Sequence, residues 1–414
     1  MRGPPRIHIP STSGQVMGTY WHLLRIPAVR NMFILTLFSR TPMWAANVVL
    51  TLHIVGPLEQ SYAMAGLVTG IQAICLGVSG PYRGRRLDRL GLRRSILPSL
   101  IVIPICWVIA PFAGYWVLLV LASVAGLFAI PTFAITRSVL IGNSALHQRH
   151  SAMALDGILS DLTYMVGPII GVAFTTVLPT PIVLLIFQLT FVAACLAIWL
   201  VNPPLNAVSA ETHPIAIIPG ATSWWRRIIP AWMGAPLLML LVIGFAGNFT
   251  LSGQSLSIVA AMRSWNAPES VGWALALWGF GSLVGGFVYG MLRTPPVSVL
   301  ALGALAISAL LVLPTPDIAW FAVLVTFTGA FSAPVVIAVS NEVSRIVPSA
   351  HRGEALSWLG TATILGNALG GPLAGAGLDA HGWQGGMLVA ALGGLIVAAI
   401  GLWHRRRRGL VNVT

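Results

Sequence analysis

Long apolar runs alternate with short polar gaps from one end of the chain to the other. A helix that crosses the hydrocarbon core of a membrane needs about 20 predominantly apolar residues, and the sequence supplies twelve runs of about that length. We therefore predict an all-α membrane protein with twelve transmembrane helices at these approximate limits: 31–53, 61–80, 96–113, 116–139, 152–176, 182–201, 237–262, 271–292, 296–313, 318–340, 355–378 and 385–403.

The amino-acid composition excludes an ordinary soluble domain. Apolar residues make up 57% of the chain and charged residues 8%, whereas a typical soluble domain has about 25% charged residues. The net charge of +13 does not indicate a nucleic-acid partner, because the basic residues lie in gaps between apolar runs. The cysteines lie inside apolar runs without the spacing of a metal site, so we predict no metal and no cofactor: Cys75, Cys106 and Cys195.

The arginines gather in alternate gaps, which predicts the orientation of the chain. Short cytoplasmic loops retain positively charged residues. One side carries 21 arginines, whereas the other has only Arg263, and Arg40 lies within the membrane. We predict that the arginine-rich side is cytoplasmic, that both termini lie there and that the number of spans is even. The chain would be a multi-pass protein of the cell membrane.

Two short segments recur at almost one spacing, which predicts two related halves. The segment GLFAIP at 126–131 recurs as GAFSAP at 329–334, and GPIIG at 167–171 recurs as GPLAG at 371–375. Copies six spans apart share their orientation in the membrane. We predict this division of the chain: a cytoplasmic tail at 1–30, a six-helix bundle at 31–201, a cytoplasmic linker at 202–236, a second six-helix bundle at 237–403 and a basic tail at 404–414.

A charged stretch, GRRLDRLGLRRS at 84–95, lies between the second and third predicted helices. A glycine, an Asp-Arg pair, a second glycine and a basic pair follow one another at fixed spacing: Gly84, Asp88, Arg89, Gly91, Arg93 and Arg94. This pattern resembles the loop between helices two and three of the major facilitator superfamily, although Arg86 and Leu92 differ from the usual pattern. The resemblance implies two six-helix bundles and secondary transport of a small molecule by alternating access.

The resemblance also implies a role for this loop. In the superfamily the loop is thought to brace the two bundles at the cytoplasmic face and to favour the outward-facing state. Asp88 could bind the positive N-terminus of a neighbouring helix and the surrounding guanidinium groups. Alternatively, the arginines only mark the cytoplasmic side, but this reading does not account for Asp88 or Gly91.

The fifth predicted helix contains a glycine–proline segment that resembles part of a motif of export-type members of the superfamily. The eleventh helix repeats the same chemistry, which weakens the segment as an export signature. The alternative is close helix packing through small residues. The two sets of residues are Gly167, Pro168 and Gly171, and Gly371, Pro372 and Gly375.

Charged residues inside the membrane are costly and are candidates for function. Arg40 and Asp161 each lie nine residues from the expected cytoplasmic start of their helix, which puts both about 14 Å deep at 1.5 Å per residue. We expect them to pair, with Asp161 binding the coupling proton and Arg40 competing with that proton. The alternative is a permanent structural ion pair. Asp156, near Arg149, is expected at the membrane interface and is a further candidate.

Polar stripes on the first and seventh predicted helices indicate a substrate path. The stripes repeat at helical spacing and comprise Trp44, Asn47 and Thr51 beyond Arg40, and Asn248, Ser252 and Ser255. Aromatic and uncharged polar groups suit a small amphipathic substrate better than a sugar. Alternatively, the serine and asparagine side chains only form hydrogen bonds between helices.

These patterns favour a transporter and no enzyme, because the sequence has no nucleotide-binding loop and no nucleophile–base arrangement. The Arg-Thr-Pro stretch at 40–42 and the segment ALDGILSD at 154–161 resemble a subgroup of small-molecule exporters. We predict a monomeric, proton-coupled exporter whose partners are a small-molecule substrate, protons and the lipid bilayer. The alternatives are an uptake permease for a nutrient, and a membrane scaffold or sensor that does not transport.

Overall fold

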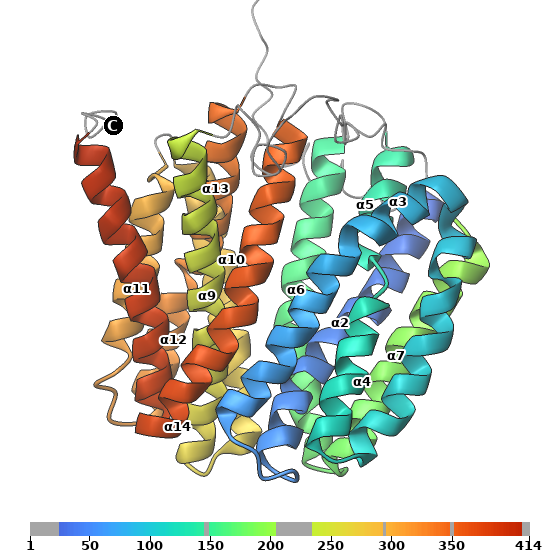
Figure 1. Cartoon of the computed structure of the whole chain (residues 1–414), viewed down its shortest axis with the longest axis horizontal. Helices are drawn as coiled ribbons and strands as arrows, with labels where there is room; N and C mark the ends of the chain where they lie inside the picture. The colour runs from blue at the N-terminus through green and yellow to red at the C-terminus, as the bar shows by residue number, and fades with distance from the viewer. Residues whose placement is uncertain (1–24, 145–148, 204–233, 293–294, 348–351, 408–414) are drawn as a thin grey trace, which may run out of the picture.

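The computed structural model describes residues 25–144, 149–203, 234–292, 295–347 and 352–407. Helices form all of the regular structure in these ranges, and Figure 1 shows them side by side along one common direction. The prediction of an all-α membrane protein is confirmed. The predicted linker at 202–236 and both terminal tails lie largely outside the described residues.

The N-terminal bundle begins with a helix that Pro27 opens and that continues through Pro42. Helix α3 (Tyr62–Ile109) bends sharply at Gly91, whose φ of +73° is easy only for glycine. The bend separates two membrane spans, Tyr62–Gly80 and Leu90–Phe112. The elements of this bundle are α2 (Pro27–Val55), α3 (Tyr62–Ile109), η1 (Ala110–Phe112), α4 (Tyr115–Leu127), α5 (Thr132–Gly142), α6 (Arg149–Thr175) and α7 (Thr180–Val201).

The C-terminal bundle has the same kinds of interruption. Its last element bends at His381 and Gly382, where the φ of Gly382 is +67°. The elements are α9 (Ala235–Ser264), η3 (Pro268–Ser270), α10 (Val271–Met291), α11 (Ser298–Leu311), α12 (Ile318–Gly329), α13 (Ser332–Ile346) and α14 (Arg352–Arg407).

The repeated segments mark a break at the same place in both halves. GLFAIP at 126–131 separates α4 from α5, and GAFSAP at 329–334 separates α12 from α13. Each segment ends on a proline, Pro131 or Pro334, which cannot donate a backbone hydrogen bond. The sequence repeat therefore corresponds to a repeated interruption of one long membrane helix.

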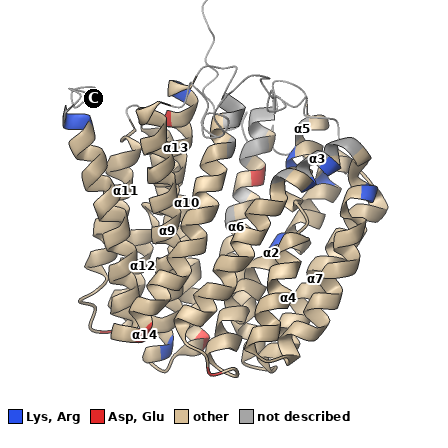
Figure 2. Ribbon diagram, in the orientation of Figure 1, with Lys and Arg blue, Asp and Glu red and all other residues tan. Residues whose placement is uncertain are grey.

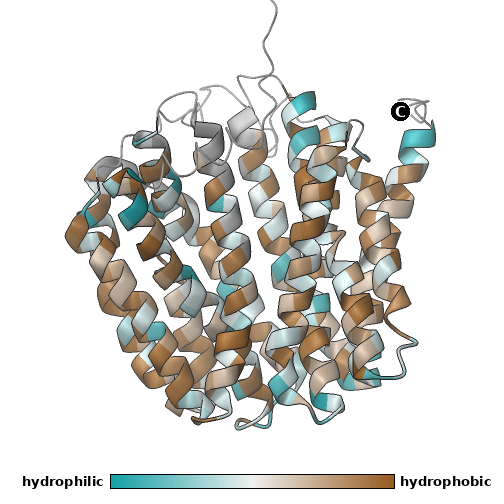
Figure 3. Cartoon of the chain, turned by 180° about the vertical axis from the view of Figure 1, so that it is seen from behind, coloured by the Kyte–Doolittle hydropathy of each residue, from teal (hydrophilic) through white to brown (hydrophobic). Residues whose placement is uncertain are grey.

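Within the described ranges, ten helical segments are long and apolar enough to cross a membrane, and α11 is a shorter apolar helix. Hydrophobic residues predominate along the helices (Figure 3). Large apolar side chains are exposed, such as Trp116 at 68% and Phe287 at 71%. Charged residues are sparse along the helices and gather mainly at one end (Figure 2). A lipid-facing surface explains this pattern. The number of crossings and the cytoplasmic side of the termini stay predictions.

Close glycine contacts join the two bundles along two seams, α3 with α14 and α6 with α10. A methyl group at Gly66 would lie 2.5 Å from the carbonyl oxygen of Gly371, and one at Gly375 would lie 2.6 Å from Cα of Ala63. On the other seam, a methyl group at Gly272 would lie 2.7 Å from Cα of Ile169. The backbones approach this closely because glycine has no side chain.

The two glycine–proline segments therefore have different roles in packing. Gly167 and Gly171 press α6 against Trp44 and Ala45 of α2, inside the N-terminal bundle. In contrast, Gly371 and Gly375 press α14 against α3 of the opposite bundle. Similar sequence supports one contact within a bundle and one between bundles.

Candidate functional site

A central cavity of about 550 Å³ lies between the two bundles. Its wall includes residues of α2, α3 and α6 on one side and of α9, α10, α13 and α14 on the other. The structure places all six residues of the two predicted polar stripes in this wall: Trp44, Asn47, Thr51, Asn248, Ser252 and Ser255. Helical spacing puts each stripe on one face, and the fold turns both faces toward the cavity.

Three aromatic side chains form one part of the wall. The rings of Trp44 and Tyr164 meet edge to face with centroids 4.7 Å apart, and those of Tyr164 and Trp278 lie 6.0 Å apart at 57°. The Tyr164 hydroxyl also lies beside Ser255 of the opposite bundle. Tyr164 thus contacts α2 of its own bundle, and α9 and α10 of the other.

Sequence reasoning missed Tyr164 and Trp278, as well as Asn367 of α14, which also lines the cavity. An isolated aromatic residue in an apolar helix has no spacing that distinguishes a cavity wall from lipid contact or core. Tyr164 did carry a weak signal, since it lies three residues before Gly167-Pro168. Asn367 also carried a signal, as a polar residue within an apolar run.

A cluster of charged side chains is buried inside the N-terminal bundle. Nη2 of Arg40 lies 2.8 Å from Oδ1 of Asp156, and Nε of Arg137 lies 3.0 Å from Oδ2 of the same carboxylate. The exposed fractions are 0% for Arg40, 1% for Asp156 and 55% for Arg137. Two guanidinium groups therefore share one carboxylate.

The guanidinium of Arg40 has two further contacts. Its Nη1 donates a hydrogen bond of 2.6 Å to Oγ of Ser160, and its Cζ lies 4.0 Å from the ring centroid of Phe133. A carboxylate, a hydroxyl and an aromatic face together offset the cost of burying this charge. Arg40 lies one helical turn before Trp44, so the cluster lies close to the cavity wall along α2.

This geometry changes the expected partner of Arg40. We expected Arg40 to pair with Asp161, but the structure pairs it with Asp156, five residues earlier on α6. The physical reason is that helical side chains point back toward the helix N-terminus, so the long side chain of Arg40 reaches a shallower residue. Asp156 is 1% exposed, and its expected position at the membrane interface stays a prediction. The side chain of Asp161 lies outside the described residues.

The charged loop between the second and third predicted helices is partly described. Arg93 donates hydrogen bonds to the carbonyl oxygens of Trp199 and Leu200, at 3.2 and 3.0 Å, and Trp199 donates one back to the carbonyl of Arg93 at 3.1 Å. Cationic side chains stabilise the C-terminal end of a helix in this way. Arg93 therefore fastens the loop to α7 within its own bundle.

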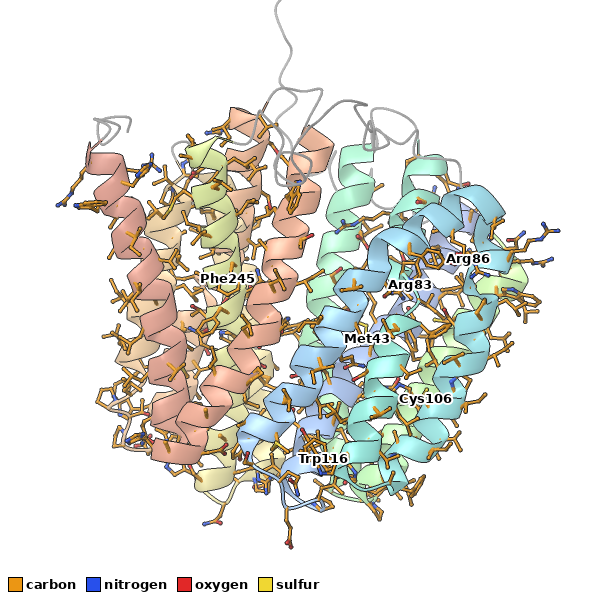
Figure 4. All side chains as sticks on the ribbon, in the orientation of Figure 1. Met43, Arg83, Arg86, Cys106, Trp116 and Phe245 are labelled. Carbon is orange, nitrogen blue, oxygen red and sulfur yellow. The ribbon has the colours of Figure 1, made fainter. Side chains whose placement is uncertain are left out.

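The structure describes only some of the other residues in this loop. Gly91 supplies the left-handed bend, and Arg94 is exposed. Arg83 directly precedes the motif, and Figure 4 labels it together with Arg86. Burial lowers the pKa of the Arg83 side chain to about 10, so this side chain stays protonated at neutral pH. The surroundings of three motif residues are not described: Gly84, Asp88 and Arg89. The brace between the bundles that the resemblance implies therefore stays a prediction.

Comparison with known proteins decides the family. The sequence model described as Major Facilitator Superfamily matches residues 32–256 and 238–412. The chain belongs to the Major Facilitator Superfamily. An uncharacterized MFS-type transporter of Burkholderia pseudomallei (strain 1106a) is 26% identical over 370 residues, covering 84% of this chain and 85% of the relative. A relative from Burkholderia mallei (strain SAVP1) has the same identity and coverage.

Solved structures share the fold of this MFS protein. A mutant form of the nucleoside transporter NupG aligns with a TM-score of 0.69 at 12% identity, covering 91% of this chain and 99% of that one. A bacterial homologue of the human lysosomal transporter Spinster, in an inward-facing and unoccupied conformation, aligns with a TM-score of 0.69 at 15% identity, covering 92% and 98%. The family and the fold indicate a transporter rather than an enzyme.

In this MFS transporter a carboxylate of one bundle caps a helix of the other. Oδ1 and Oδ2 of Asp379, in α14, accept hydrogen bonds from the backbone N–H groups of Tyr62 and Ala63 at 2.9 and 3.0 Å. These residues begin α3, where the helix dipole favours a negative charge. We call the end of the molecule that includes Asp379 and Arg263 the outer end. There Asp379 links the bundles directly.

Neutralising this cap is expected to loosen the outer end. Hydrogen bonds to a charged acceptor are about 1 kcal/mol stronger than neutral ones. Asp379→Asn should therefore lower the ratio of molecules with a closed outer end to molecules with an open outer end roughly fivefold. The measurement is the distance distribution between spin labels at Pro57→Cys and Glu269→Cys, after replacement of the native cysteines by alanine. The variant should populate longer distances than its parent.

Asp317→Asn is the matched control for this experiment. Oδ1 of Asp317 also caps a helix, accepting a hydrogen bond of 2.8 Å from the N–H of Trp320, but the cap lies within the C-terminal bundle. This variant should leave the distance distribution unchanged. Equal distributions for Asp379→Asn and its parent would show that the cap does not hold the bundles together.

Proposed function

We propose that this protein exports small, partly apolar molecules across the cell membrane in exchange for protons, by alternating access. The observation that carries the proposal is the central cavity between the bundles, next to the buried charge cluster. The cavity offers a substrate aromatic and uncharged polar groups from both bundles. Because each bundle supplies part of the wall, a relative motion of the bundles would open and close the site.

The charge cluster supplies a means of proton coupling. Asp156 holds Arg40 of α2 and Arg137 of α5, so its protonation would remove the negative charge that both guanidinium groups share. Arg40 is fully buried and would then need another partner. We propose that this change shifts α2 against α6, the helices that carry Trp44 and Tyr164 into the cavity wall. Asp161 remains a second candidate for the proton site.

The comparisons support transport in general terms, and the direction is our proposal. The glycine–proline segment that resembles an export motif presses α6 against α2, which is the helix pair that the charge cluster also joins. Packing that is this close lets a small local shift in the cluster reach the cavity wall. Export in exchange for protons would use the inward proton gradient of the cell membrane.

The decisive experiment follows protons in everted membrane vesicles that hold an acidic interior. A panel of uncharged and amphipathic aromatic compounds is added, and proton release is compared for the parent, Asp156→Asn and Asp161→Asn at equal amounts of folded protein. We expect release with the parent and Asp161→Asn, and none with Asp156→Asn. Loss of release only in Asp161→Asn would move the coupling site to that residue.

A second variant guards against a folding defect in Asp156→Asn. Ser160→Ala removes only the hydroxyl to which Arg40 donates, and should shift the pH dependence of proton release while the protein remains folded. Failure of every compound to release protons from parent vesicles, combined with accumulation of a labelled compound by whole cells, would overturn export and indicate uptake.

A further inference from the structure

We infer that the substrate is an uncharged aromatic molecule with polar hydrogen-bonding groups, bound between the aromatic side chains and the amide side chains of the cavity. This inference rests on the proposed transport function and names the substrate class for it. Three features of the wall carry it: the absence of charged side chains from its described lining, the aromatic rings and a set of hydrogen-bonding groups without a partner in the described residues.

The first feature is charge. No Asp, Glu, Arg, Lys or His side chain is among the described residues that line the cavity. A charged group taken out of water without a partner is strongly disfavoured. The nearby guanidinium of Arg40 is 0% exposed and already contacts Asp156, so an anion has no access to it. The cluster carries one more positive than negative charge, which further disfavours a cation.

The second feature is the aromatic wall. Trp44 and Tyr164 belong to one bundle and Trp278 to the other, and neither the Trp44–Tyr164 pair nor the Tyr164–Trp278 pair stacks face to face. A planar ligand can therefore stack on rings that do not stack on one another. Aromatic faces also attract cations, but a carboxylate that would complement a cation is absent from the described lining of this cavity.

The third feature is the hydrogen-bonding capacity that the protein leaves unused. The side-chain amides of Asn47 and Asn367 lie on opposite bundles, are exposed, and form no hydrogen bond among the described residues. The indole N–H groups of Trp44 and Trp278 are buried and also have no partner in the described part of the chain. Indole groups only donate, and amides donate and accept. The two exposed amides can therefore donate to and accept from a ligand, which favours a ligand with polar groups such as ring carbonyls.

The experiment measures binding with purified full-length protein in lipid nanodiscs. The probes are flavone, 3-phenylcoumarin and 2-phenylquinolin-4-one, each as the neutral parent and as its para-carboxylate and para-trimethylammonium derivatives. Calorimetric titration should show that at least one neutral probe binds about tenfold or more tightly than both of its charged derivatives. Equal or tighter binding of a charged derivative, or no binding by any neutral probe, would overturn the inference.

Two variants test the named side chains. Asn367→Leu should weaken binding of the neutral probes about tenfold by removing a hydrogen-bonding partner, and Trp278→Phe should weaken it less because the ring remains. The matched control is Trp273→Phe on the same helix, whose side chain is 64% exposed and which should bind as the parent does. Unchanged binding in Asn367→Leu would contradict the role given to the amides.

This experiment separates the inference from the proposed function. Selective binding of neutral probes without proton release in vesicles would contradict proton-coupled export and leave the substrate class standing. Proton release by neutral and charged probes alike would support export and overturn the substrate class.

Discussion

Asp156→Ala is expected to destabilise the folded protein by about 3–5 kcal/mol, the cost of breaking a buried ion pair by removing one partner. The variant would leave the guanidinium of Arg40, which is 0% exposed, without its carboxylate, and would free Arg137 as well. The Ser160 hydroxyl and the Phe133 ring would remain but carry no negative charge. The measurement is reversible unfolding in mixed detergent and SDS micelles.

The double variant Arg40→Met with Asp156→Leu tests whether the lost stability comes from leaving Arg40 buried without its carboxylate. Well-packed apolar residues in place of a buried ion pair are often neutral or stabilising, so the double variant should recover most of the lost stability but release no protons with substrate. Glu269→Ala, at an exposed position, should leave stability unchanged. A loss of less than about 1 kcal/mol in Asp156→Ala would mean that the pair does not hold α2 and α6 together.

Gly66→Ala is expected to reduce transport at least tenfold while the protein still folds. The added methyl group would lie 2.5 Å from the carbonyl oxygen of Gly371 and 2.6 Å from the backbone nitrogen of Pro372, whereas non-bonded heavy atoms in contact are about 3.5–4.0 Å apart. These are backbone atoms, so α3 and α14 have to separate. The outer end would then close less often, and the cycle of alternating access would stall.

Gly80→Ala provides the control for this substitution in the same helix. A methyl group at Gly80 meets no atom within 4 Å, so transport should stay near the parent rate. Spin labels at Pro57→Cys and Glu269→Cys should report longer distances for Gly66→Ala and unchanged distances for Gly80→Ala. Transport at the parent rate by Gly66→Ala would show that the tight seam is not needed for the cycle.

Local patterns indicated the helical fold and the two polar stripes that line the cavity, because both depend on short-range periodicity. The stripe from Trp44 to Thr51 lies on one face of α2, and that from Asn248 to Ser255 lies on one face of α9. A polar side chain is costly in lipid, so a polar face turns toward the cavity or a neighbouring helix. Tyr164 and Trp278 were not predicted, because aromatic residues are also common in lipid-facing positions.

The sequence by itself determined that this chain is a helical membrane protein, since hydrophobic length acts locally, and it predicts two related halves. Tertiary structure decided which partners meet: Arg40 with Asp156, Gly371 with Gly66, and Asp379 with the start of α3. These contacts depend on helix tilt, on side-chain reach and on helix register, and a shift in register by a fraction of a turn would change the partners. Residues far apart in sequence meet only when two bundles pack, and no local spacing encodes that meeting.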